Sequence, residues 1–406
     1  MARAKRTDNK GRVLKIGESQ DKSGRYAYKW TDATGKRSTV YALDLLELRQ
    51  KEKQIQRDLE EGISTKGGDI TLNQLFDVFI ETKSNIRKST NVNYRNFWDV
   101  SVKNSIIGEM KINQIKQMHI KRLYADLKQR GLSGSSIQTY HVLISSVFQL
   151  AVDSDLIRKN PCRNCRKVIK VEPHNKKALT IRQQEILLEY VNNSNVYNVY
   201  CPMLNFAFST ALRIGEIIGL RQDDIDMKEN VVHIRRQLIY KDYGDGFKFH
   251  ITQTKTQSGN RDIPLTQSAR KALIKQKELD FITGRRSIEK EIDGMKGFVF
   301  INSKGMPMLP FNFNAMLRNV VNSYNKKEIA QAKRENREPE LLPHFSVHNM
   351  RHTFCTRLCE STNDIKFIQQ VMGHADFSTT MDIYTHITQE NMREKAEAIK
   401  GNLVLM

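Results

Sequence analysis

Two segments with little apolar periodicity, residues 61–69 and 159–177, divide the chain and constrain its fold more than any other feature. The first, EGISTKGGD, combines glycines with polar residues, and the second is basic and contains two prolines. The chain has 406 residues, which is enough for two or three domains of about 150 residues each. We therefore predict three domains, at residues 1–65, 70–160 and 175–406.

The first predicted domain has the pattern of a small sheet followed by a helix. Strands are predicted at residues 12–19, 25–31 and 36–43, and a helix at 43–61. In the second strand Tyr26, Tyr28 and Trp30 share one face, because successive side chains of a strand point to opposite sides. The helix should cover this aromatic face, leaving Arg25 and Lys29 on the other side as candidate DNA-binding residues.

The rest of the chain is mainly helical. Residues 72–157 show the apolar spacing of a bundle of four helices. After residue 178 the pattern is mixed and predicts a mainly helical domain with a small antiparallel sheet. Strands are predicted there at residues 231–240, 247–253 and 261–263, and helices at 211–220, 267–278, 312–325, 347–360 and 364–372. The fold class is therefore multidomain α+β.

Positive charge is concentrated towards the N-terminus. The formal net charge is +21, and residues 1–176 hold 34 of the 66 Lys and Arg residues but only 19 of the 45 Asp and Glu residues. Such an excess favours a polyanionic partner, although DNA, RNA and an anionic membrane surface would each satisfy it. No apolar run approaches the roughly 20 residues of a membrane-spanning helix, and the basic N-terminus lacks the apolar core of a signal peptide. We therefore expect a cytoplasmic protein without a membrane partner.

The cysteines do not indicate a disulfide framework, because there are five of them and the chain lacks a secretory signal. Cys162 and Cys165 form a Cys-x-x-Cys pair, but a structural zinc ion needs about four ligands, and no second pair stands at a suitable spacing. We expect these two cysteines to lie in a basic linker. Cys355 and Cys359, four residues apart in a helical stretch, should pack in a core. No metal ion and no cofactor is expected.

A dispersed series of residues in the C-terminal part carries the chemistry. In chain order the series is Arg213 in STALRIGEIIGL, Lys255 in TQTKTQSGNRDIPL, His348 and Arg351 in SVHNMRHTF, His374 in VMGHADFSTT, and Tyr384 in MDIYTHIT. Its order and spacing resemble the active site of the tyrosine recombinase (phage integrase) family. The small basic sheet ahead of a helical bundle further resembles the three-domain integrases of phages and conjugative transposons. One departure is Ala211, which follows Thr210 where the family often has glycine.

The resemblance implies that Arg213 and Arg351 bind the non-bridging oxygens of a DNA phosphate. A guanidinium suits this task because it stays charged and donates two parallel hydrogen bonds. Cationic side chains held beside the charge that develops in the transition state would stabilise it, which is the role of a metal ion in other phosphoryl-transfer enzymes. Glu216, three residues after Arg213 on the same predicted helix, should hold the Arg213 guanidinium.

The resemblance implies that the remaining residues of the series form the covalent bond with DNA and transfer the protons. Tyr384 would attack the phosphorus and form a 3′-phosphotyrosine, which retains the bond energy for rejoining without ATP. Lys255, in a glycine-containing turn between two predicted strands, would protonate the departing 5′ oxygen. His348 and His374 would accept the tyrosine proton and donate to a non-bridging oxygen; the sequence does not decide which does which.

We therefore predict a site-specific DNA recombinase that integrates and excises a mobile element. Its partners would be double-stranded DNA and three further copies of itself in a synaptic homotetramer, with DNA-bending and excision factors left open. The main alternative is a type IB topoisomerase, followed by a catalytically silent DNA-binding protein and a metal-dependent nuclease. The apolar C-terminus, GNLVLM at residues 401–406, should dock either on its own catalytic domain or on a neighbouring protomer.

Overall fold

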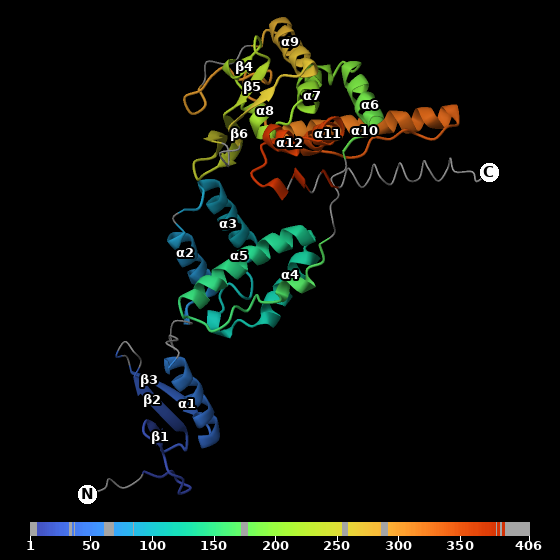
Figure 1. Cartoon of the computed structure of the whole chain (residues 1–406). Helices are drawn as coiled ribbons and strands as arrows, with labels where there is room; N and C mark the ends of the chain where they lie inside the picture. The colour runs from blue at the N-terminus through green and yellow to red at the C-terminus, as the bar shows by residue number, and fades with distance from the viewer. Residues whose placement is uncertain are drawn as a thin grey trace, which may run out of the picture. The chain divides into compact units, whose positions relative to one another are not determined.

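The computed structural model describes residues 6–31, 35, 37–60, 69–83, 85–171, 178–253, 259–285, 291–378, 380–381 and 384–385. The chain forms two compact units, residues 1–174 and 175–406, whose elements are labelled in Figure 1. The predicted α+β class is confirmed, with an N-terminal antiparallel sheet, a helical bundle and small sheets in the second unit. No helix within the described ranges is both long and apolar enough to span a bilayer.

The N-terminal sheet is antiparallel and packs against one helix. Its elements are β1 (Glu18–Gln20), β2 (Tyr26–Thr31), β3 (Arg37–Ala42) and α1 (Leu45–Glu60). Tyr26 and Tyr28 are buried against Leu48 of α1, while Trp30 is partly buried beside them. The helix therefore covers the aromatic face, as the strand alternation predicts.

The first predicted strand is wrong, because β1 begins only at Glu18 instead of at residue 12. Asp8 accepts hydrogen bonds from the backbone N–H groups of Lys10 and Arg12, at 2.9 and 2.8 Å. These bonds close a turn, and the isolated bridge between Thr7 and Val13 flanks it. The backbone around residue 12 is thus occupied by a local side-chain interaction and does not enter the sheet.

The helical bundle has its own apolar core. It contains α2 (Leu72–Thr82), α3 (Lys88–Ser101), the short 3-10 helix η2 (Ile112–Gln114), α4 (Gln117–Gln129) and α5 (Gly134–Asp153). Trp98 stacks on Phe76 with ring centroids 4.0 Å apart. Its ring N–H donates to Asn73 Oδ1 at 2.9 Å, so the buried indole has no unsatisfied donor.

The segment predicted as a second linker is instead part of this bundle up to at least residue 169. Cys162 and Cys165 are 1% and 0% exposed and belong to the bundle core. A short helix, η3 (Cys165–Val168), packs against α4 and α5. The linker prediction is wrong. The many basic residues of the segment are typical of a linker, but its two cysteines are small and apolar and pack as core residues.

The second unit combines helices with two small sheets. Its helices are α6 (Ile181–Asn192), α7 (Cys201–Phe208), α8 (Ile214–Ile218), α9 (Gln267–Ile282), α10 (Pro310–Glu335), α11 (Val347–Ser361) and α12 (Ile365–Met372). Its strands are β4 (Ile225–Asp226), β5 (Val231–Ile234), β6 (Arg236–Asp242), β7 (Phe247–Gln253) and β8 (Arg261–Pro264). One sheet has the order β4-β5-β8, and β6 pairs with β7 in the other.

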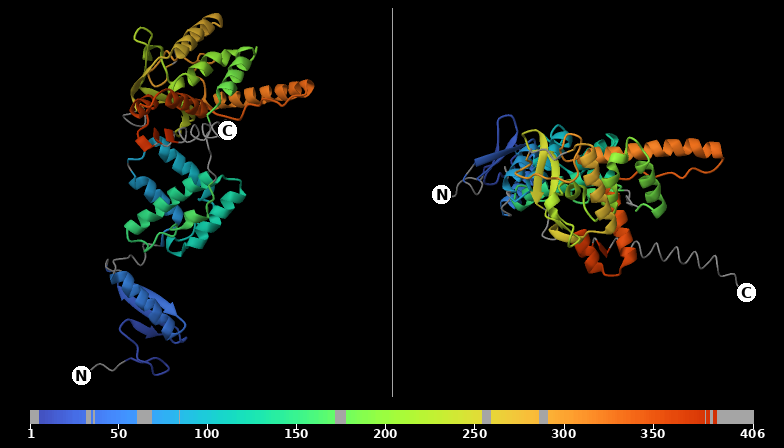
Figure 2. Two further views of the ribbon diagram at one scale, coloured as in Figure 1. Left: turned by 45° about the vertical axis from the view of Figure 1, so that its right-hand side comes forward. Right: turned by 90° about the horizontal axis from the view of Figure 1, so that it is seen from above.

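Several boundaries of the second unit differ from the predicted ones, and three of these differences are the most informative. The strand predicted at 231–240 is two strands that belong to different sheets, separated at Arg235. The helix predicted at 211–220 begins only at Ile214, because Arg213 has extended backbone angles. Helix α10 continues ten residues beyond the predicted end at 325, and its far half projects from the unit in both views of Figure 2. Cys355 and Cys359 are buried in the core of this unit, as predicted.

The burial of the cysteines predicts their reactivity. All five thiols are free and buried, and burial raises the pKa of Cys162, Cys165 and Cys201, so these three form little reactive thiolate. We expect the folded full-length protein to react slowly with a thiol reagent, and all five cysteines to react at once in guanidinium chloride. Peptide mapping by mass spectrometry identifies the sites. Fast labelling of Cys162 in folded protein would contradict its place in the bundle core.

Candidate active site

Arg213 and Glu216 meet at the start of α8. Arg213 is the residue that precedes the first helical turn, and its backbone N–H donates to Glu216 Oε2 at 2.9 Å. Its guanidinium Nη1 donates to Glu216 Oε1, also at 2.9 Å. The predicted pairing of the two side chains is present, but it arises from a helix-capping geometry and not from one helical face. The Arg213 side chain is 41% exposed and Glu216 only 3%, so the arginine faces outward from a buried anchor.

Arg351 lies on α11 and is almost fully buried. Its two terminal nitrogens donate to the carbonyl oxygens of Ala211 and Met372, and Nη1 lies 4.0 Å from Glu216 Oε2. Burial, followed by the positive charge of Arg213, lowers the pKa of Arg351 to about 9. An anion placed beside this guanidinium would relieve the repulsion between the two arginines, so the site favours a phosphate.

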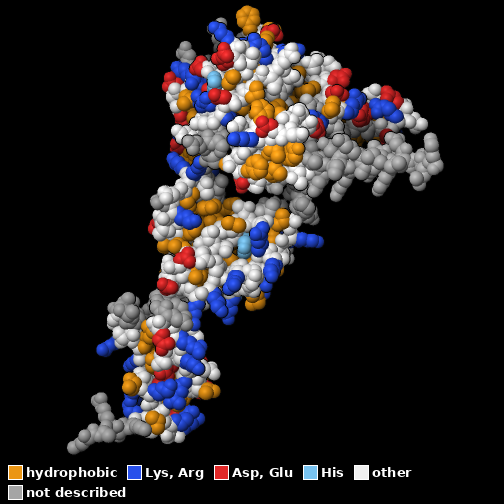
Figure 3. Space-filling view, viewed as in Figure 1, with side chains coloured by type: hydrophobic (Ala, Val, Ile, Leu, Met, Phe, Trp, Pro, Cys, Tyr) orange, Lys and Arg blue, Asp and Glu red, His pale blue; other side chains and the backbone are white. Residues whose placement is uncertain are grey.

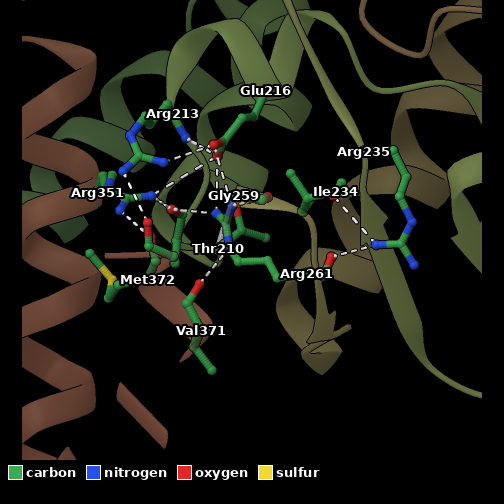
Figure 4. Close-up of polar contacts among 12 residues, drawn as sticks. Thr210, Arg213, Glu216, Ile234, Arg235, Gly259, Arg261, Arg351, Val371 and Met372 are labelled. Carbon is green, nitrogen blue, oxygen red and sulfur yellow. Dashed lines mark hydrogen bonds and ion pairs between the residues drawn. The ribbon is translucent and has the colours of Figure 1, made fainter. Parts of the chain in front are cut away.

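Arg261 is a functional candidate that sequence reasoning missed. Its side chain is 6% exposed, and Nη2 lies 3.0 Å from Glu216 Oε2 (Figure 4). Burial alone would raise the pKa of Glu216, but its contacts with Arg261 and Arg213 outweigh burial and lower it. A sequence signal existed, because strand alternation puts Arg261 on the same side of β8 as the core residue Ile263.

The turn after α12 brings His374 to the arginines. Gly373 ends α12 with φ 61°, a left-handed conformation that favours glycine, and its carbonyl accepts from Arg213 Nη2 at 3.4 Å. His374 Nδ1 lies 3.0 Å from the hydroxyl of the buried Thr380. Burial, together with the charges of Arg351 and Arg213, lowers the pKa of His374 to about 4. The imidazole is therefore neutral near pH 7.

An open pocket unites three of the predicted catalytic residues. Arg213, His348 and Arg351 line it together with residues 237–240 of β6, and its volume is about 410 Å³. His348 lies in the first turn of α11, three residues before Arg351, and is exposed. The pocket is thus lined by two guanidiniums and an imidazole that come from the residue before α8 and from α11, which are far apart in the sequence.

Tyr384 is held by a different contact. Its ring is partly buried against the core of the second unit, and its hydroxyl donates to Asn363 Oδ1 at 3.2 Å. Asn363 lies between α11 and α12. Tyr384 does not belong to the described residues that line the pocket of Arg213 and Arg351.

Lys255 lies outside the described residues, as does the apolar C-terminus. The strands on either side of Lys255 are β7 and β8. Because β7 pairs with β6 and β8 with β5, they belong to different sheets. In the sequence, the β6–β7 hairpin therefore precedes Lys255, and a strand of the other sheet follows it.

Arg25 and Lys29 are exposed on the N-terminal sheet, away from its aromatic core. The Arg25 guanidinium lies 5.9 Å from the ring centroid of Tyr41 on the neighbouring strand. Figure 3 shows basic side chains gathered over this sheet and its helix. This surface can neutralise phosphate groups of a nucleic acid.

The low pKa of His374 predicts a pH dependence of stability. The folded-state pKa of about 4 lies below the value of about 6.5 in an unfolded chain. The unfolded chain therefore binds a proton first as the pH falls, so stability is complete above pH 6.5 and is lost towards pH 4. We expect the melting temperature of the wild type to fall a few degrees further between pH 6.5 and 4.5 than that of His374→Gln.

The control for this measurement is His344→Gln, which removes an exposed histidine of the same unit. Its melting curve should keep the wild-type pH dependence. Parallel curves for His374→Gln and the wild type would show that folding does not disfavour protonation of His374.

Two family profiles match the chain. Residues 177–391 match the phage integrase family, and residues 2–59 match the DNA binding domain of the Tn916 integrase. The first match contains every residue of the predicted catalytic series, and the second contains the whole N-terminal sheet with Arg25 and Lys29.

Individual proteins resemble the chain over nearly its full length. It is 31% identical over 399 residues to the transposase from transposon Tn1545 of Streptococcus agalactiae and to the transposase from transposon Tn916 of Enterococcus faecalis, covering 95% of this chain and 94% of each relative. The solved Tn1549 transposon integrase in complex with transposon right end DNA is 28% identical with a TM-score of 0.68, covering 82% of this chain and 100% of that one. A lambda integrase tetramer bound to a Holliday junction shares the fold, with 18% identity, a TM-score of 0.54, and coverage of 92% and 95%. The chain therefore belongs to the phage integrase family of tyrosine recombinases.

Proposed function

We propose that this recombinase integrates and excises a mobile element of the conjugative-transposon kind. The observation that carries the proposal is the pocket in which Arg213, His348 and Arg351 converge above the buried Glu216. The near full-length similarity to the Tn1545 and Tn916 transposases supports the type of element. A type IB topoisomerase is not favoured, because the similarity to transposases and integrases includes the N-terminal DNA-binding domain.

In the proposed reaction the pocket holds the scissile phosphate. Arg213 and Arg351 donate to its non-bridging oxygens and stabilise the charge that grows in the transition state. Neutral His374 assists them: if Nδ1 accepts from the Thr380 hydroxyl, the ring proton is on Nε2, from which it can be donated to a phosphate oxygen. No metal ion takes part in these steps.

The covalent step exchanges one phosphate ester for another. The Tyr384 oxygen bonds to phosphorus, its proton passes to a base for which exposed His348 is a candidate, and the bond from phosphorus to the 5′ oxygen breaks. Lys255 gives the departing oxygen its proton. The reverse sequence, with a 5′ hydroxyl from another strand, rejoins the DNA. Before attack, the Tyr384 hydroxyl must leave Asn363, to which it donates in the unbound protein.

The proposed division of labour follows the predicted domains. Residues 1–65 bind the arms of the element through the face that carries Arg25 and Lys29. Residues 70–160, together with the bundle segment that continues to residue 169, bind the core site, and residues 175–406 cut it. The separate apolar cores of the N-terminal sheet, the bundle and the second unit support this division. We further propose a homotetramer on DNA in the cytoplasm, joined where required by DNA-bending and excision factors.

The first test replaces the nucleophile. Tyr384→Phe keeps the ring but removes the attacking oxygen, so covalent adduct on a nicked suicide substrate in EDTA should fall below about 1% of the wild-type yield. Binding of the same DNA should stay within about twofold, because affinity comes from many phosphate contacts.

A matched control is Tyr324→Phe, which removes another partly buried hydroxyl of the same unit. It should form adduct normally. A normal yield of covalent adduct from Tyr384→Phe would contradict the assignment of Tyr384 as the nucleophile.

The second test removes residues 1–65. The N-terminal sheet has its own core and contributes no residue to the pocket, so cleavage of a short core site should persist. Recombination of full element ends should fall about tenfold or more, because a tethered second binding domain raises the effective concentration at the core site. Equal recombination by truncated and full-length proteins would contradict an arm-binding role.

A further inference from the structure

Arg261 occupies the centre of the site without facing the pocket. It is the first residue of β8, and its side chain points inward, towards Glu216 (Figure 4). Its backbone is fixed from the outside, because Arg235 Nη1 donates to its carbonyl oxygen at 3.1 Å. Only 8% of Arg261 is exposed, and Arg261 does not line the pocket. It is therefore not placed to bind the phosphate itself.

The Arg261 guanidinium connects three segments that carry candidate catalytic residues. It donates to Glu216 Oε2 at 3.0 Å and Oε1 at 3.3 Å, in the helix that begins after Arg213. It donates to the carbonyl of Val371 at 2.9 Å, three residues before His374. It donates to the carbonyl of Gly259 at 3.2 Å, on the segment that leads from Lys255 into β8. Each of these partners lies three or four residues from a residue of the proposed mechanism: Glu216 from Arg213, Val371 from His374, and Gly259 from Lys255.

The turn before His374 also packs directly on this guanidinium. A Cβ atom added at Gly373 would lie 2.9 Å from Arg261 Nη1 and 3.0 Å from its Cδ and Cζ atoms. Such distances are shorter than carbon contacts allow, so glycine is required there for close packing as well as for its positive φ. The position of the His374 turn therefore depends on where the Arg261 side chain lies.

Arg261 and Arg351 share their surroundings. Both donate to the carbonyl of Ala211, Arg261 at 3.5 Å, and both lie within 4.0 Å of Glu216 Oε2. Arg261 thus occupies the inner side of Glu216 and leaves the outer side to Arg213. A lysine could supply the same charge, but only a planar fork with several donors satisfies a carboxylate and separate carbonyls together.

We propose that Arg261 is a positioning residue for DNA cleavage, which sets the orientation of Arg213, Arg351 and His374 towards the phosphate. This inference rests on the proposed roles of those three residues. It assigns Arg261 no contact with DNA. Its effect is on charge stabilisation in the transition state, and not on the leaving-group proton.

The test compares Arg261→Lys with the wild type in the full-length protein. The variant keeps the charge that Glu216 needs but loses the fork, so the cleavage rate on suicide DNA should fall about tenfold to hundredfold, as expected for small misplacements of catalytic groups. Noncovalent DNA binding should change less than about threefold. Gly373→Ala, which presses on Arg261 from the opposite side, should produce the same pattern.

Modified substrates separate a positioning role from a merely structural one. A methylphosphonate at the scissile position lacks the phosphate charge and so needs less help from the guanidiniums; it should recover most of the deficit of Arg261→Lys relative to the wild type. A 5′-phosphorothiolate, whose sulfur leaves without a proton, should not recover it but should rescue Lys255→Ala. The matched control is Arg337→Lys, which alters a partly buried pair with Glu328 elsewhere in the unit and should cleave both normal and modified DNA like the wild type.

Four outcomes are distinguishable. Selective recovery on the methylphosphonate supports the positioning role. A deficit that is equal on all substrates and follows a loss of folded protein, measured by thermal melting, overturns it in favour of a structural role. Wild-type cleavage by Arg261→Lys also overturns it, whereas absence of any adduct from the wild-type protein in the same gel would reject the proposed function itself.

Discussion

The buried carboxylate of Glu216 is the interaction on which the site depends. It is 3% exposed and lies within 4.0 Å of the guanidiniums of Arg213, Arg261 and Arg351. An unpaired carboxylate at this depth would cost several kcal/mol, and so would each of the two buried arginines without an acceptor. These groups are therefore stable only together, and their mutual dependence joins α8, β8 and α11 at one point.

The same cluster of Glu216 and three arginines carries a net positive charge that favours binding of an anion. One carboxylate cannot neutralise three guanidiniums, so positive charge remains, and Arg213 exposes it to the pocket. This field is fixed before DNA arrives, so little reorganisation is needed when charge develops. Burial and this field together lower the pKa of His374 and keep its imidazole neutral. The Tyr384 hydroxyl is outside this arrangement, on Asn363, so the charge-stabilising and nucleophilic parts of the site are held by separate contacts.

Most of the fold could be predicted where one local pattern dominates. The aromatic alternation of β2, the helices of the bundle and strand β7 follow from periodicity, because one face of each element must be buried. The errors lie where other interactions compete with periodicity. Asp8 accepts hydrogen bonds from the backbone of the segment that is predicted to start the first strand. Cys162 and Cys165 pack in the bundle core, so the basic segment that contains them belongs to the bundle.

By itself, the sequence determined the residue types of the site and the local pair of Arg213 with Glu216, because the three-residue spacing of a capping box suffices to bring those residues together. Only the tertiary structure decided that Arg261, 45 residues further along, shares the same carboxylate. It also decided that Arg351 is buried against Ala211 and Met372. Contacts of this kind depend on how distant elements pack. Strand alternation can put Arg261 on the same side of β8 as the core residue Ile263, but only the packing places a buried carboxylate beside it.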